Sequence, residues 1–156
     1  MTPYRFSKLH EKRIDVIIEL YGNLYRLRDT LSSIVKLLRQ EDGNQGENAG
    51  KVREAWNKAQ TEIEEFKSHL NKNRLLIPDQ LCKQLDNYYK KSLQAIASLL
   101  LASFNEKNSD LALESTDLST NDSKEDLIRA TFILSEQIAP LLVEIEKEFR
   151  NLLGSA

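Results

Sequence analysis

The segment RFSKLHEKRIDVIIELYGNLYRLRDTLSSIVKLLRQ, residues 5–40, decides the fold of this chain. Its apolar side chains recur in alternating steps of three and four residues, which places them in one stripe along an α-helix. The stripe consists of Ile17, Leu20, Leu24, Leu27, Leu31, Ile34 and Leu38. Such a helix is stable only when other parts of the chain cover its apolar stripe. We therefore expect the remaining residues to form helices that pack against this one.

Three further segments show the same helical spacing. The expected helices span about residues 3–40, 48–73, 78–105 and 123–153, and flexible connections cover residues 41–47 and 106–122. Long helices joined in this way are typical of antiparallel bundles. The sequence thus predicts an all-α fold, an up-down-up-down four-helix bundle with long antiparallel helices, in a single domain of residues 1–156.

Two of these helices have a special feature. Pro140 lies inside the last helix and should bend it, because proline removes one backbone hydrogen bond. In the third helix the segment SLQAIASLLLASF, residues 92–104, is apolar on nearly every face, which predicts a surface for self-association or for a partner. The stripe expected for the third helix comprises Leu81, Leu85, Tyr89, Leu93, Ile96, Leu100 and Phe104.

Composition and charge limit the class of protein. The net charge is only -2, and Cys82 is the single cysteine, so no internal disulfide can form and a reducing compartment is expected. The N-terminal segment is too charged for a secretory signal. No apolar run is as long as a membrane span, which needs about 18 residues. We therefore expect a cytoplasmic protein without a membrane segment.

The sequence contains no recognisable catalytic constellation. A di-metal bundle requires Glu-x-x-His pairs, and neither His10 nor His69 has a glutamate three residues before it. The chain also has no glycine-rich phosphate loop and no Gly-x-Ser-x-Gly elbow. We therefore predict that the protein is not an enzyme and uses no metal or cofactor, and we identify no small-molecule ligand.

Two hypotheses of function follow from the surface residues. The first is a helical interaction or accessory protein that self-associates or binds a protein partner. Its expected contact surface comprises His10, Glu11, Lys12 and Arg13, together with Leu93, Ile96, Leu100 and Phe104.

The second hypothesis is an RNA-binding or RNA-cleaving bundle. Arg5 and His10 have the Arg-x-x-x-x-His spacing of the HEPN ribonucleases, and the basic residues of the first helix would guide the strand. The overall charge is not that of a typical nucleic-acid-binding domain, so the interaction protein is the preferred hypothesis.

Two segments carry a resemblance to known sequences. FSKLHEKRIDVIIELYGNLYRL opens the chain, and NKNRLLIPDQLCKQLD follows later. They resemble a group of uncharacterised bacterial proteins that share a KLHEKRxxVIxxLY opening and a later NRxxxPxxLC corner. The resemblance implies a bacterial helical protein and implies no activity. The matching residues are Phe6, Leu9, His10, Glu11, Lys12, Arg13, Val16, Ile17, Leu20, Tyr21, Asn73, Arg74, Pro78, Leu81 and Cys82.

Overall fold

The computed structural model describes residues 3–39, 45–109 and 116–154, and within them the side chains of residues 7–39, 50–103 and 124–154. The described chain is helical and contains no strand. The elements are α1 (Pro3–Arg39), α2 (Gln45–Lys72), the 3₁₀ turn η1 (Arg74–Leu76), α3 (Asp79–Ser109), α4 (Thr116–Phe132), the π-helix η2 (Ile133–Ile138) and α5 (Ala139–Gly154).

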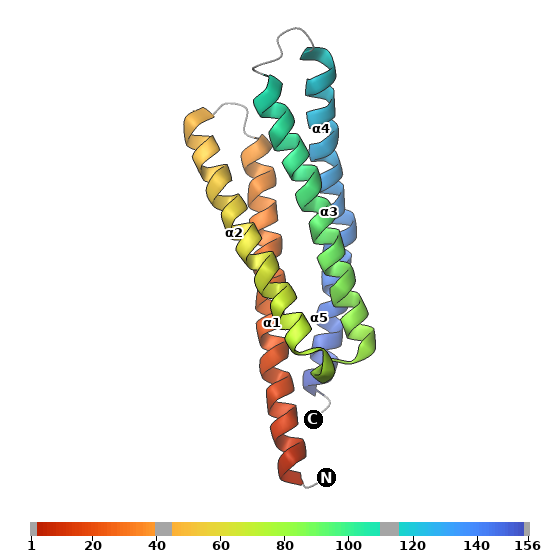
Figure 1. Cartoon of the computed structure of the whole chain (residues 1–156). Coiled ribbons are helices and arrows are strands. Elements are labelled where there is room, and N and C mark those ends of the chain that lie inside the picture. The colour runs from red at the N-terminus through yellow and green to blue at the C-terminus, as the bar shows by residue number, and fades with distance from the viewer. Residues whose placement is uncertain (1–2, 40–44, 110–115, 155–156) are drawn as a thin grey trace.

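The helices run alternately up and down, as Figure 1 shows. α1 and α2 form one antiparallel pair, α3 and α4 form the other, and η2 and α5 continue α4 back toward the starting end. The predicted all-α antiparallel bundle is therefore confirmed. At the end of the bundle where α2 turns into α3, the first turns of α1 project beyond the corner (Figure 1).

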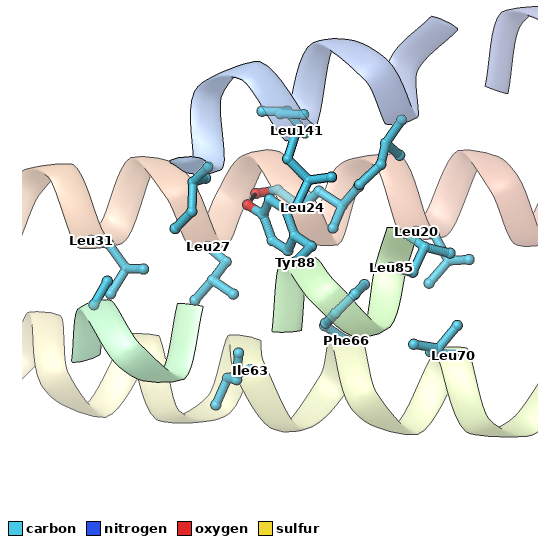
Figure 2. Packing of buried hydrophobic residues seen from close by; sticks show 14 of the residues in the cluster. Leu20, Leu24, Leu27, Leu31, Ile63, Phe66, Leu70, Leu85, Tyr88 and Leu141 are labelled. Carbon is cyan, nitrogen blue, oxygen red and sulfur yellow. Dashed lines mark hydrogen bonds between the residues drawn. The ribbon is translucent and has the colours of Figure 1, made fainter. Parts of the chain in front are cut away.

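The stripe of α1 forms the centre of the core. Leu20, Leu24 and Leu27 are completely buried, and the stripe predicted from the sequence is confirmed from Ile17 through Ile34. Tyr88 of α3 reaches toward α1, where its hydroxyl donates a hydrogen bond to the carbonyl of Leu24 at 2.6 Å (Figure 2). Its ring meets the ring of Phe66 from α2 edge to face at 5.8 Å. Three helices thus meet around one aromatic side chain.

The stripe predicted for the third helix is wrong at Leu93 and Leu100, while Tyr89 and Ile96 pack partly against the core. Leu93 and Leu100 are exposed, whereas Leu99, seven residues after the buried Ser92, lies in the core. Small residues occupy much of the buried face, and small side chains let two helices approach closely. The face of α3 that packs inward is formed by Leu81, Cys82, Leu85, Tyr88, Ser92, Ala95, Leu99 and Ala102.

The predicted connections are longer than the observed ones. α2 begins at Gln45, α3 continues to Ser109 and α4 begins at Thr116, so parts of the expected loops 41–47 and 106–122 are helical. Glu106 and Lys107 are good helix formers, and Asp117 favours a helix start because its charge complements the helix dipole. Residues 40–44 and 110–115 lie outside the described part of the chain.

The irregularity expected at Pro140 takes the form of a π-helix. Pro140 has no backbone N–H, so the carbonyl of Glu136 cannot receive its usual helical hydrogen bond. The turn before the proline widens instead, and the N–H of Ala139 bonds to the carbonyl of Leu134, five residues earlier. The helical rod therefore continues through the proline rather than ending there.

Candidate functional site: the projecting end, the apolar face of α3 and a groove

The segment LHEKR lies on the projecting end of α1. Glu11 and Lys12 are exposed, whereas His10 and Arg13 are partly buried. The Nε atom of Arg13 donates a hydrogen bond to the carbonyl of Leu76 in η1 at 2.9 Å, across 63 positions of sequence. This contact brings the segment LHEKR together with the segment NKNRLLIPDQLCKQLD. Arg13 therefore anchors the corner between α2 and α3.

Other residues of the second segment hold the same corner. Nδ2 of Asn73 donates to the carbonyl of His69 at 2.8 Å, and the guanidinium of Arg74 bonds both carboxylate oxygens of Asp86 at 2.6 and 3.1 Å. The thiol of Cys82 is buried against the carbonyls of Arg74 and Ile77. Each of these contacts stabilises the turn between α2 and α3.

The environment of Cys82 gives it no nucleophilic character. Burial raises the pKa of the Cys82 thiol, and the neighbouring Arg74 only partly opposes this effect. The thiol therefore stays protonated at neutral pH, and the reactive form of cysteine is the thiolate. Cys82 acts as a small buried residue of the corner.

His10 differs from the other residues of the LHEKR segment. Its Nε2 atom is buried and has no hydrogen-bond partner within the described part of the chain. The side chain of Arg5, with which it would form a ribonuclease-like pair, lies outside the described side chains. The described contacts thus bring no second catalytic group to His10.

The apolar segment of α3 presents leucines to solvent. Leu93 is 41% exposed, and Leu100 and Leu101 are each 49% exposed. Ile96 packs partly against the core, and the side chain of Phe104 lies outside the described residues. Of the four apolar residues expected at a contact surface, Leu93 and Leu100 are therefore exposed.

Sequence reasoning missed a polar seam between α1 and α2. Asn23, nearly completely buried, donates from Nδ2 to Nδ1 of His69 at 2.6 Å and accepts from Nη2 of Arg26 at 2.7 Å. Farther along, the hydroxyl of Thr30 donates to the carboxylate of Glu62 at 2.8 and 3.0 Å, and both residues are buried. Asn23 and Thr30 are seven residues apart, so a second stripe at helical spacing was the signal that could have revealed the seam.

Gly22 provides room for this seam. A Cβ atom added at Gly22 would lie only 3.0 Å from Nη1 of Arg26. The absence of a side chain therefore lets the Arg26 guanidinium fold back along α1 and hold Asn23. Because the contact is with the flexible end of an exposed side chain, it accounts for only part of the presence of a glycine inside a long helix, where the residue costs about 1 kcal/mol relative to alanine.

Glu62 makes the seam sensitive to pH. Burial raises the pKa of the Glu62 carboxyl, although Thr30, Lys58 and Arg26 oppose the shift. The folded protein thus favours the protonated carboxyl. The stability that the protonated Glu62 carboxyl contributes to the fold is fully present below the pKa of the unfolded chain, about 4.3. This stability is lost as pH rises through the higher pKa that Glu62 has in the folded protein.

Glu62→Gln should therefore remove part of the pH dependence of folding. Glutamine keeps an acceptor for Thr30 without a charge to desolvate, so the stability of the variant relative to the parent should increase from pH 4 to pH 7. Urea unfolding at both pH values measures this difference, and Glu64→Gln, at an exposed position of the same helix, is the control. A difference that is the same at both pH values would exclude a raised pKa at Glu62.

A groove lies between α1 and α5 near the projecting end. Its volume is about 220 Å³, and its lining is mostly apolar. Glu146 at its edge accepts hydrogen bonds from the Tyr25 hydroxyl at 3.0 Å and from Nη2 of Arg150 at 2.9 Å. The hydrogen bond with Tyr21, together with burial and Glu146, raises the pKa of Tyr25 to about 12, so this hydroxyl remains a donor. The groove is lined by Ile17, Ile18, Tyr21, Glu146, Phe149, Arg150 and Leu153.

Neither a metal site nor a membrane segment is found in the described ranges. There, His, Cys, Asp and Glu side chains form no group of three or more that could hold a metal ion. None of the helices searched in that part of the chain has the length and apolar character needed to cross a bilayer. Comparison of the chain with protein-family models, with curated proteins and with solved structures finds no match.

Proposed function

We propose that this chain is a non-enzymatic helical interaction protein that binds another protein chain, either a second copy or a different partner. The observation that carries the proposal is the exposure of Leu93, Leu100 and Leu101 on α3. The buried face of this helix is already formed by other residues, including Ala95 and Leu99. The three leucines therefore add apolar surface that the core of the bundle does not use.

Further apolar side chains support a contact role for the outer surface. Single exposed leucines are common, but several large ones close together on one helix are typical of interaction surfaces. The rod formed by α4 and α5 also exposes Ile128, Phe132 and Val143. The exposed charges of Glu11 and Lys12 on the projecting end would help to fix the orientation of a bound partner.

The experiment is recovery of a tagged copy from its native host at moderate salt. We expect the parent to carry a protein at fixed stoichiometry, and the double variant Leu93→Glu/Leu100→Glu to lose it by about tenfold or more. Because both leucines are exposed, the variant should unfold at the same temperature as the parent. Gln60→Glu/Ser68→Glu adds the same charges at exposed positions of α2, away from the α3 leucines, and should keep the partner.

The RNA hypothesis provides the contrary outcome. Recovery of RNA without a protein partner, with loss of the RNA on changing His10 to alanine, would contradict the proposed function. Equal recovery of a protein partner by the parent and by Leu93→Glu/Leu100→Glu would show that the exposed leucines of α3 are not the contact surface.

A further inference from the structure

Asn23 satisfies its two neighbours in only one orientation of its amide. The Nη2 atom of Arg26 lies 2.7 Å from Oδ1 of Asn23, and an arginine side chain has donors and no acceptor. Oδ1 therefore faces Arg26, and the Nδ2 amino group faces Nδ1 of His69 at 2.6 Å. An amide amino group only donates, so Nδ1 of His69 accepts this hydrogen bond. The bond from Arg26 thus orients Asn23, and Asn23 determines which nitrogen of His69 is free of a proton.

The neutral His69 ring in this contact has its proton on Nε2. Nδ1 can accept a hydrogen bond only while it is unprotonated, so the single ring proton of the neutral form is on the other nitrogen. A proton added at Nδ1 would point at the amino group of Asn23. Rotating the amide to offer its oxygen instead breaks the bond to Arg26 and turns the amino group toward that guanidinium. Asn23 is 1% exposed, so water has little access to relieve either contact.

A second partner for His69 lies one turn away on α1. A carboxylate oxygen of Glu19 is 3.9 Å from Nε2, which is too far for a hydrogen bond but close enough for an ion pair with a protonated ring. Glu19 precedes Asn23 by four residues, so the two lie in one row along the helix. The side chain of Glu19 is 61% exposed, whereas Asn23 is buried. The neutral ring thus has a buried partner, and the charged ring has a partner at the surface.

The other charged groups near His69 belong to α1 and to α2 itself. Arg26 is the cation on the α1 side. Glu65 and Lys72, in the neighbouring turns of α2, are exposed and opposite in charge. Farther along the seam, burial raises the pKa of the Glu62 carboxyl, and Arg26 opposes this shift. Acidification therefore affects Glu62 as well as His69, so the ring of His69 is a more specific readout than the stability of the whole protein.

We propose that His69 is a proton-sensitive latch between α1 and α2, bonded to Asn23 while its ring is neutral and drawn toward Glu19 when its ring is protonated. Histidine commonly serves as a pH switch in proteins because it gains its charge near neutral pH. The carbonyl of His69 also accepts the hydrogen bond from Nδ2 of Asn73, which precedes the corner between α2 and α3. Protonation therefore loosens the seam at the turn that leads into this corner. The latch acts within one chain and does not depend on a protein partner.

Nitrogen NMR of the ¹⁵N-labelled full chain tests the latch directly. In its neutral form the ring of His69 should be a single Nε2–H tautomer, and its signals are identified by their loss in His69→Gln. On acidification, the side-chain amide signals of Asn23 should shift with the same midpoint as the ring. A neutral ring that carries its proton on Nδ1, or Asn23 signals that do not follow the ring, would overturn the inference.

Asn23→Asp gives the sharpest comparison, because a carboxylate can accept hydrogen bonds from Arg26 and from a protonated Nδ1 at once. The midpoint of the His69 titration should rise by about one pH unit or more, the usual effect of an opposite charge in direct contact. Asn57→Asp makes the same change at an exposed position of α2, more than three turns before His69, and should leave the midpoint near that of the parent. Equal midpoints in the two variants would contradict the latch.

Glu19→Gln tests the second partner of His69 without changing a buried residue. With no carboxylate to attract the charged ring, the midpoint of the His69 titration should fall below that of the parent. An unchanged midpoint would overturn the exchange of partners. Because Glu19 is largely exposed, this variant should fold as the parent does, and the measurement remains decisive if Asn23→Asp does not fold. None of these outcomes depends on the partner recovered from the host, so the latch and the proposed function are judged separately.

Discussion

Leu24→Ala should lower the free energy of unfolding by about 2–5 kcal/mol, the usual cost of removing a buried leucine side chain. Leu24 is completely buried at the centre of the α1 stripe, where Tyr88 and Phe66 pack nearby (Figure 2). The hydrogen bond from Tyr88 goes to the backbone carbonyl of Leu24 and survives the substitution. The loss therefore measures apolar packing alone, and urea denaturation of the full chain determines it.

Ile18→Ala is the matched control on the same helix. Ile18 is largely exposed, so its truncation should change the free energy of unfolding of the single chain by less than about 0.5 kcal/mol. The comparison is made at a concentration low enough to avoid association. Equal losses for Leu24→Ala and Ile18→Ala would contradict the assignment of the buried stripe.

Ala95→Leu should also destabilise the protein, by about 1–3 kcal/mol, because added methyl groups overfill a well-packed core. Ala95 is completely buried on the face of α3 that packs inward. Ala97→Leu places the same side chain two residues later, at an exposed position, and should leave stability nearly unchanged. Thermal unfolding of the two variants compares the two faces directly. The opposite ranking would show that the inward face is the one expected from the sequence, which includes Leu93 and Leu100.

The sequence predicts α1 and α3 with unequal success for a physical reason. In α1, large apolar residues at steps of three and four alternate with charged ones such as Glu19, so only one face can be buried. The second half of α3 is apolar on nearly every face, and hydrophobic spacing then cannot distinguish Leu93 from Leu99. The packing of the rest of the bundle against α3 decides which face is buried. The small residues Ser92 and Ala95 lie on that face and carry little hydrophobic signal.

The candidate site shows the same limit. The LHEKR and NRLLIP segments are visible in the sequence as unusual strings, but spacing along each helix does not show that Arg13 meets Leu76. Nor does it show that Thr30 donates a hydrogen bond to a buried Glu62, because acidic residues on a helix usually face water. Contacts between helices depend on how the helices are rotated about their axes. That rotation is fixed only when the whole bundle is packed.

The mass of the species recovered from the native host tests the central claim most directly. A single chain has a mass of 18.0 kDa. Light scattering coupled to gel filtration should give a larger mass for the parent, equal to the chain plus a stoichiometric protein partner or a second copy. The mass should fall toward that of one chain in Leu93→Glu/Leu100→Glu. A parent recovered at 18.0 kDa, or bound only to RNA, would contradict a protein that works by binding other protein chains.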